Sequence, residues 1–444
     1  MLAVYNKLPR RLQDLACTVE GARVEWQRYR GPYAALEAEV VARGAWSQDR
    51  MQACQAARVR RFVMHAAERV PFYREHFRRH GVDPRSIRRA DDLRRVPPIT
   101  KADVQARPRH FLAEGWPAQD LVAVHTSGTT GAGLKFWASR AAVQEQWAVW
   151  WRYRRWHGIY RSRWCDYFGG RPVVPLAATE APFFRTNAAG RQRIHSGYHL
   201  SPAHEAAYVH ALETNDGSWI HGYPSMLTLV ADAVLRLRGP GGVGARDVTI
   251  GAEKLHEHQR RVIESAFSRP VRQHYGLAEA VANISECERG ALHVDEDFAV
   301  LELGAEGTFG TNLSNFAFPL LRYTMTDGFV SRDEPCGCGH PGRVIASIEG
   351  RDEDYVVLPS GARVGRLDHV FKDLDFVAEA QLVQRSDGRV TIRWSGAGET
   401  ASAAAAIRRA AGAYLGDELR IDLERVAAVP RTAAGKLRFV VREP

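Results

Sequence analysis

The stretch HTSGTTGAGLKFW, which begins at His125, has the composition of a loop that binds an anion. Its hydroxyl residues, glycines and lysine are Thr126, Ser127, Thr129, Thr130, Gly128, Gly131, Gly133 and Lys135. Glycines let backbone N–H groups approach a ligand closely, and hydroxyl groups add donors to anionic oxygens. This composition favours a phosphate ligand; a Gly/Thr turn without a ligand is the alternative.

The stretch does not match the GxxxxGK[ST] phosphate-binding motif. Gly128 and Gly133 have the required spacing, but Leu134 stands where that motif needs its lysine. Neither Ser nor Thr follows Lys135, and the residues after the loop, 134–139, predict a strand where the motif needs a helix. If phosphate binds here, it does so in a loop of another type.

Four more short motifs follow along the chain, and each is weak alone. They are Tyr-Gly-x-x-Glu (Tyr275, Gly276, Glu279), LRYTMTDG with Asp327, IEGRDEDYVVLPSG with Arg351, and VPRTAAGKLRF with Lys436. Together with the hydroxyl-rich loop they form a set of five, in a fixed order and at wide separations. That combination is specific.

With these motifs the chain resembles the adenylate-forming superfamily, and within it the short phenylacetate–CoA ligase and coenzyme F390 synthetase branch. The stretches VPFYREHFRRHGVDP, TSGTTGAGLKF, GYPSML and CGCG carry the second likeness, which covers nearly the whole chain. The resemblance implies that ATP converts a carboxylate to an acyl-adenylate, which then passes its acyl group to a thiol. The adenylate supplies the leaving group that a carboxylate lacks.

The resemblance also implies roles for individual residues. The nucleotide-binding residues would be Thr126, Ser127, Gly128, Thr129, Thr130, Gly131, Lys135, Gly251, Ala252, Glu253, Tyr275, Gly276, Asp327 and Arg351. Tyr275 would lie against adenine, while Asp327 and Arg351 would hold the ribose. Glu279 would bind Mg²⁺, which prefers hard oxygen ligands. The family often has Pro-Lys at the end of the phosphate loop, where this chain has Gly133-Leu134-Lys135.

Lys436 is the predicted catalytic lysine, together with Glu279 as the metal-binding catalytic residue. A lysine at Lys436 would place its charge between the attacking carboxylate and the α-phosphate, where negative charge accumulates. The resemblance implies that the small domain carrying it rotates between the two half-reactions. The hinge position is often Asp in the family and is Glu353 here, so a carboxylate is kept.

The acid itself would be an aryl acid such as a hydroxybenzoate or phenylacetate, in a pocket that includes His221, Tyr223 and Ala280. A histidine buried in the core is an equal interpretation of His221. The acceptor would be CoA or an acidic acyl carrier protein acting in trans, and an amine is the alternative acceptor. A nucleotide- or RNA-binding protein on a degenerate ligase fold is the alternative of another class.

Three cysteines and a histidine, namely Cys287, His293, Cys336 and Cys338, have the ligand types of a structural Zn²⁺ site. The two pairs are far apart in the sequence, so only the fold could bring them together. His340 is a competing ligand. The alternative is two turns that contain buried or free cysteines.

Composition and patterning set the remaining expectations for this 444-residue chain. Alternating strands and helices predict an α/β fold with a largely parallel sheet. The adenylate-forming domain would span 1–351, mostly helical over 1–96 and with mixed or parallel sheets after that, and a small mobile α+β domain would span 352–444. No apolar run of about 18 residues is present, which predicts a cytoplasmic protein without a membrane span.

The net charge of +10 comes from the N-terminal quarter of the chain. Residues 1–110 contain 23 Lys and Arg against 12 Asp and Glu. A basic surface of this kind attracts nucleic acid, an acidic protein or a phosphate-bearing ligand. Since no zinc finger, RNA-binding aromatic signature or basic heptad repeat accompanies it, nucleic acid is not the expected partner.

Overall fold

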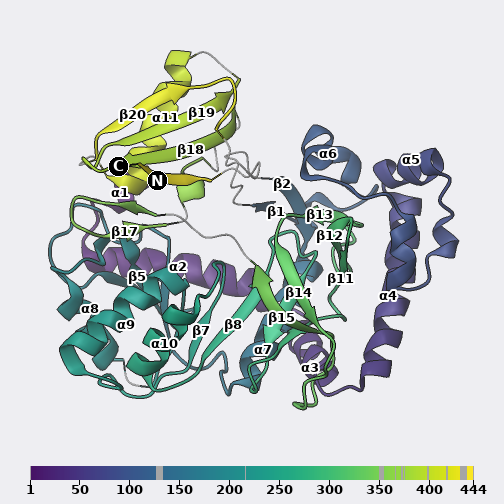
Figure 1. The fold of residues 1–444 in the computed structure, drawn as a ribbon, viewed down its shortest axis with the longest axis horizontal. Coiled ribbons are helices and arrows are strands. Elements are labelled where there is room, and N and C mark those ends of the chain that lie inside the picture. Colours follow the sequence, from purple (N-terminus) through teal and green to yellow (C-terminus); the bar gives the residue numbers. More distant parts are fainter. Residues whose placement is uncertain are drawn as a thin grey trace.

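The computed structural model describes residues 2–126, 134–215, 217–349, 355–365, 367–371, 374, 376–397, 400–416, 419–430 and 438–443. Figure 1 shows a large lobe, which contains most of the chain, and a small lobe formed by strands near the C-terminus. Among the helices described, none combines the length and the apolar character needed to cross a bilayer.

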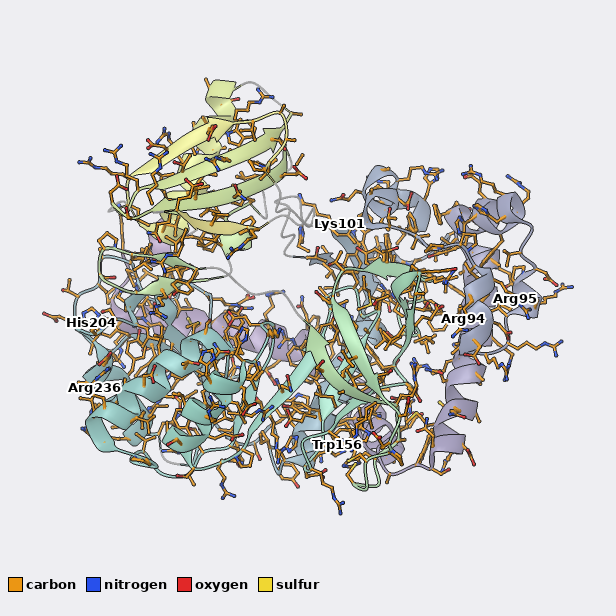
Figure 2. All side chains as sticks on the ribbon, viewed as in Figure 1. Arg94, Arg95, Lys101, Trp156, His204 and Arg236 are labelled. Atoms are coloured by element: carbon orange, nitrogen blue, oxygen red, sulfur yellow. The ribbon has the colours of Figure 1, made fainter. Side chains whose placement is uncertain are left out.

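Helices dominate the N-terminal part of the large lobe. They are α1 (Leu2–Tyr5), α2 (Arg10–Tyr29), α3 (Tyr33–Arg43), α4 (Gln48–Arg69), α5 (Pro71–His80) and α6 (Lys101–Ala106). Ser47 caps α4 by accepting a hydrogen bond from the N–H of Arg50, and α5 ends at Gly81, whose φ of 64° suits glycine. Figure 2 shows Lys101, the first residue of α6, on the side of that helix nearer the small lobe.

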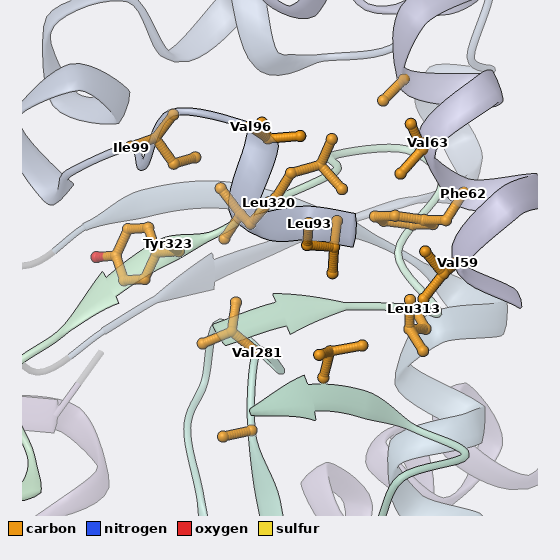
Figure 3. Close-up of a cluster of buried hydrophobic side chains, with 14 of the residues drawn as sticks. Val59, Phe62, Val63, Leu93, Val96, Ile99, Val281, Leu313, Leu320 and Tyr323 are labelled. Atoms are coloured by element: carbon orange, nitrogen blue, oxygen red, sulfur yellow. The ribbon is translucent and has the colours of Figure 1, made fainter. Parts of the chain in front are cut away.

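The apolar face of α4 builds the first hydrophobic core. Val59, Phe62 and Val63 lie one helical turn apart on that face and are fully buried. They belong to one buried cluster with Leu320 and Tyr323 from a much later part of the chain (Figure 3). The helical N-terminal region is therefore joined to the strands that follow residue 280 by burial of apolar surface.

A ten-stranded mixed sheet forms the centre of the large lobe, in the order β14-β15-β10-β9-β8-β7-β6-β3-β5-β4. Its strands are β3 (Cys165–Gly169), β4 (Phe184–Asn187), β5 (Gln192–Ser196), β6 (Trp219–Gly222), β7 (Val248–Ile250), β8 (Val271–Gly276), β9 (Asn283–Glu286), β10 (Leu292–Val294), β14 (Gly328–Arg332) and β15 (Val344–Glu349). Strands β5, β3, β6, β7 and β8 are mutually parallel, whereas the others pair antiparallel. The predicted parallel order thus covers only part of the sheet.

The connections explain this mixture. Helices α8 (Glu205–Glu213), α9 (Pro224–Arg238) and α10 (Glu257–Phe267) cross over between successive parallel strands, as parallel pairing requires. From β8 onward, no described helix separates the strands of this sheet up to β15, and neighbouring strands run in opposite directions. Helices α8, α9 and α10 cover one face of the sheet, while α7 (Arg140–Trp156) and α2 cover the other (Figure 1).

Smaller sheets complete the fold. They are β1 (Leu121–His125) with β2 (Lys135–Ser139), β11 (Ala299–Gly304) with β12 (Gly307–Asn312) and β13 (Tyr323–Met325), β16 (Val356–Val357) with β17 (Arg363–Val364), and, in the small lobe, β20 (Ile421–Arg425), β19 (Val390–Gly396), β18 (Val377–Arg385) and β21 (Val440–Glu443). Helix α11 (Thr400–Leu415) packs on the small-lobe sheet. The strand predicted at the exit of the hydroxyl-rich loop is confirmed as β2, and β16 and β17 pair antiparallel.

A buried ion-pair cluster joins α7 to the turn between β10 and β11. The Arg152 guanidinium donates to Asp295 at 2.7 Å and to Asp297 at 2.8 Å, and all three side chains are almost completely buried. Arg43 of α3 also contacts Asp297, at 3.3 Å. Burial and two neighbouring carboxylates act in opposite directions on the Arg152 pKa, and the carboxylates dominate, so the arginine stays charged.

Arg152→Met is therefore expected to lower the free energy of unfolding by about 3–5 kcal/mol, because it leaves two buried carboxylates without their main counter-ion. Urea unfolding followed by circular dichroism measures this. Arg74→Met is the matched control, since its partner Glu114 is exposed and surface pairs contribute less than about 1 kcal/mol. Equal losses in the two variants would contradict the interpretation.

Candidate active site

The hydroxyl-rich loop connects β1 to β2, which pair as a hairpin. His125 and Lys135 form the last residue pair of the hairpin. Beyond it, the Thr126 hydroxyl accepts a hydrogen bond from the Leu134 N–H at 2.8 Å, and the Thr126 N–H donates to the Leu134 carbonyl at 2.9 Å. The two ends of the loop are thus held together. The predicted phosphate-binding residues Ser127, Gly128, Thr129, Thr130 and Gly131 lie outside the described residues.

Three segments with predicted roles leave the same edge of the main sheet. Because β6, β7 and β8 are parallel neighbours, their carboxyl ends meet at one edge, where open α/β sheets bind ligands. Tyr223 follows β6, the Gly251–Glu253 segment follows β7, and Gly276 ends β8. The Glu253 carboxylate accepts a hydrogen bond from the Ser225 N–H at 3.0 Å, which connects the segment after β7 to the start of α9.

Tyr275 and Asp327 meet at this edge although 52 residues separate them. The Tyr275 hydroxyl donates to Asp327 Oδ2 at 2.8 Å. Phe329 of β14 packs edge-on against the Tyr275 ring, with centroids 5.1 Å apart. The structure therefore brings together two residues predicted to hold the adenine and the ribose, and it fixes the direction of the tyrosine ring.

Glu279 follows β8 by three residues and is largely buried. Its backbone carbonyl accepts a hydrogen bond from the Asn312 side chain at 3.3 Å. The next residue, Ala280, has a φ of 57° and donates its N–H to the Leu277 carbonyl at 3.0 Å. This tight turn directs the chain from β8 toward β9 and brings a carboxylate near the sheet edge.

Two imidazoles lie under the site, between the sheet and α7. His221 of β6 is hydrogen-bonded through Nδ1 to the Thr249 hydroxyl at 2.9 Å, which agrees with the interpretation of a packed histidine. His274 of β8 contacts the ring of Trp150 at a centroid distance of 5.3 Å. Burial, reinforced by the charge of Arg154, lowers the pKa of both His221 and His274 to about 3. Both rings are therefore neutral at neutral pH.

Arg154 occupies a tryptophan-rich layer beside these imidazoles. Its guanidinium lies 4.6 Å from the Trp151 ring centroid and 5.0 Å from that of Trp219. Within the described part of the chain, no carboxylate lies at ion-pair distance from Arg154, and burial lowers its pKa. Cation–π contacts therefore stabilise its charge.

The sequence motifs did not single out Arg154 or His274, nor the tryptophans of α7 that surround them. Trp151 is buried, while the Trp150 indole N–H donates to Asn283 at 2.9 Å. The spacing of the aromatic residues and Arg154 along α7 could have indicated that they share one helix face. A polar residue four positions after an aromatic one lies on the same helix face, which here is the face covering the sheet.

The remaining predicted site residues divide into two groups. Arg351, Glu353 and Lys436 lie outside the described residues. The predicted metal ligands Cys287, His293, Cys336 and Cys338, by contrast, are brought together, with one ligand atom from each within 4.8 Å of all the others.

Comparisons with known proteins show the family and the fold of the chain. The family model of the CapK C-terminal domain matches residues 356–443. Protein CapK of Staphylococcus aureus is 23% identical over 450 residues, covering 99% of this chain and 98% of the relative. The phenylacetate–coenzyme A ligase of Escherichia coli K12 is 40% identical over 339 residues, covering 70% of this chain and 74% of the relative.

Among solved structures, a 2-hydroxyisobutyryl-CoA ligase in complex with 2-HIB-AMP and CoA superposes with a TM-score of 0.56 at 20% sequence identity. The match covers 90% of this chain and 91% of that ligase, and it establishes a shared fold. The fold and the relatives together define the class of the protein, which is that of the adenylate-forming, AMP-producing acid–thiol ligases. Within that class, the chain belongs to the phenylacetate–coenzyme A ligase family.

The buried imidazoles predict acid sensitivity. Because their folded pKa values lie near 3 and the ordinary value is 6.5, protons bind preferentially to the unfolded chain. Their contribution to stability is complete above about pH 6.5 and is lost as the pH falls toward 3. His274→Phe is expected to reduce the slope of unfolding free energy between pH 6 and 4 by about 1.4 kcal/mol per pH unit.

Urea unfolding at a series of pH values measures that slope. His210→Phe is the control for the loss of an imidazole at the surface, since its side chain is 73% exposed. An unchanged slope in His274→Phe would show that this ring is protonated in the folded protein as readily as in the unfolded chain.

Proposed function

We propose that the protein uses ATP to convert an aryl carboxylic acid to its acyl-adenylate and then transfers the acyl group to the thiol of coenzyme A. The observation that carries the proposal is the hydrogen bond between Tyr275 and Asp327 at the carboxyl edge of β6, β7 and β8. Two residues from separate motifs meet there, in the place where this type of sheet binds nucleotides. Membership of a family of CoA ligases supports the choice of reaction.

The proposed binding of ATP divides among the elements around this edge. Tyr275 and the Gly251–Glu253 segment hold the adenine, and Asp327 with Arg351 holds the ribose. The loop closed by Thr126 and Leu134 surrounds the β- and γ-phosphates, and Glu279 binds magnesium. ATP and magnesium are sufficient for this proposal, which does not depend on zinc.

Lys436 is the proposed catalytic residue, within a lid of residues 352–444 that moves over the adenylate-forming domain of residues 1–351. When the acid attacks the α-phosphate, negative charge grows on the phosphate oxygens. A lysine ammonium directed at those oxygens stabilises the transition state more than the ground state. Tyr198 of the large lobe packs within the small-lobe core, so the two lobes are in contact.

The proposed acid is aromatic, on the evidence of the layer between α7 and the sheet. Tyr167 stacks on His221 with centroids 5.8 Å apart, and Trp150 contacts His274. An aromatic ring packs well among such side chains. The aromatic side chains of this layer favour an aryl acid, such as a hydroxybenzoate or a phenylacetate, over an aliphatic acid.

Coenzyme A is the proposed acceptor in preference to an acyl carrier protein or an amine. The basic N-terminal region suits the phosphates of CoA. An acidic carrier protein would be attracted by the same charge, so a direct comparison of acceptors is needed. The alternative of an RNA-binding protein without chemistry is disfavoured, because Glu279, Asp327, Arg351 and Lys436 are all retained.

Lys436→Ala is expected to slow adenylate formation about 100- to 1000-fold, the range for loss of one charge-stabilising contact in a dry site. ATP–pyrophosphate exchange with magnesium over hydroxybenzoates, phenylacetate, cinnamates and fatty acids measures the rate and names the acid. Arg420→Ala removes an exposed cation from the same lobe and serves as the control. Exchange that persists in Lys436→Ala would remove the lysine from the mechanism.

Tyr275→Phe is expected to weaken AMP binding about tenfold, because the hydrogen bond that orients Asp327 toward the ribose is lost. Isothermal titration calorimetry with AMP gives the affinity without any turnover. Tyr160→Phe, at an exposed tyrosine, controls for the loss of a phenolic hydroxyl. If Tyr275→Phe binds AMP as tightly as the unchanged protein, the Tyr275–Asp327 contact has no part in nucleotide binding.

A further inference from the structure

Four side chains converge at the end of the large lobe that is remote from the small lobe. Cys287 and His293 flank the β9–β10 turn, while Cys336 and Cys338 lie in the loop between β14 and β15. Figure 2 labels Trp156 at this end of the molecule, and His340, two residues after Cys338, stacks on that tryptophan at 4.0 Å. The four candidate ligands therefore come from two hairpins.

Two of the distances between candidate ligand atoms are close to the edges of a tetrahedron around one zinc ion. Zinc–sulfur and zinc–nitrogen bonds of about 2.3 and 2.0 Å put tetrahedral sulfurs roughly 3.8 Å apart and sulfur–nitrogen pairs roughly 3.5 Å apart. The Cys287 and Cys336 sulfurs are 3.7 Å apart. Cys338 Sγ lies 3.3 Å from His293 Nε2. A disulfide would instead require about 2.05 Å.

The surroundings of the cluster prepare these groups for a metal. His293 Nδ1 donates to the Pro341 carbonyl at 3.2 Å, which leaves the Nε2 lone pair directed at the sulfurs. The backbone N–H of His340 donates to Cys338 Sγ at 3.4 Å, a contact that stabilises a thiolate. His340 itself is engaged with Glu288 and with the Gly44 carbonyl, so its ring is not the fourth ligand.

We propose that Cys287, His293, Cys336 and Cys338 bind one structural Zn²⁺ ion that fastens the β14–β15 hairpin to the main sheet. Three thiolates and one imidazole are a soft, closed ligand set, which suits zinc in a structural site. All four positions are filled by protein groups, which leaves no position for substrate or water.

The position of the ion explains why the hairpin needs it. β14 is the outermost strand of the sheet, and β15 is joined to β10 through two residue pairs, Leu292–Ile345 and His293–Val344. The zinc ion lies beside this short ladder. Asp327 directly precedes β14, so the clamp at one end of the hairpin steadies the nucleotide-facing residue at the other, about 17 Å away for five residues of strand.

Metal analysis of the full chain, purified without added metal, tests the proposal directly. Inductively coupled plasma mass spectrometry is expected to find one zinc per chain, and Cys336→Ser to reduce it at least tenfold. Cys54→Ser, at a cysteine outside the cluster, is expected to keep the full zinc content. One closed site per chain would hold one zinc ion. A zinc content below about 0.1 per chain in the unchanged protein, roughly one tenth of full occupancy, would overturn the proposal. Iron in place of zinc would overturn it as well.

A second measurement uses the unchanged protein, so its result does not depend on whether a cysteine variant folds. Cobalt(II) exchanged into the unchanged protein is expected to give the intense visible absorption of a tetrahedral site and a sulfur-to-metal charge-transfer band in the near ultraviolet. Absence of these bands would contradict the ligand set.

AMP affinity measured after zinc removal by a chelator is expected to fall severalfold, and restoring zinc is expected to recover it. Only this last readout rests on the proposed nucleotide site. Failure of AMP binding with zinc still present would therefore count against the proposed function and leave the metal site intact. Unchanged AMP affinity after zinc loss would overturn the role of the clamp.

Discussion

Parallel pairing of β6, β7 and β8 is the constraint on which the rest of the site depends. Each of these strands is too short to be stable alone, and each is held by its neighbours and by α9 and α10 packed over one face. Because the three strands point the same way, the residues that leave them emerge together. Tyr223, Glu253 and Tyr275 are far apart in the sequence. The parallel order of the sheet places them at one edge.

The fold class was predictable because crossover helices separate the strands between residues 192 and 276, and that alternation has a regular pattern. The expectation of mixed or parallel sheets is confirmed, but the pairing order of the antiparallel strands was not predicted. Strands β9, β10, β14 and β15 are short, and the separate sheet β11–β13 lies between β10 and β14 in the sequence, so their partners depend on packing against α4, α7 and the core around Leu320. The length of the connecting loops indicates which strands pair, whereas the apolar periodicity of a strand does not.

The candidate site shows the same division between local and tertiary information. Tyr275, Glu279 and Asp327 were recognised because short motifs surround them, and the Tyr275–Asp327 contact now joins two of those motifs. Arg154 and His274 have no such motif. Their surroundings arise only when α7 is laid across the sheet, so burial, the tryptophan rings and the depressed imidazole pKa values could not be predicted from sequence.

The register of the β14–β15 hairpin has a mechanical consequence. Gly328 pairs with Glu349, so the residue after Asp327 and the last residue of β15, where the chain departs toward the small lobe, are cross-strand neighbours. The cysteine cluster lies at one end of this hairpin. The opposite end carries Asp327 and the last residue of β15. A shift of this end of the hairpin would therefore move Asp327 and the start of the connection to residues 355–443 together.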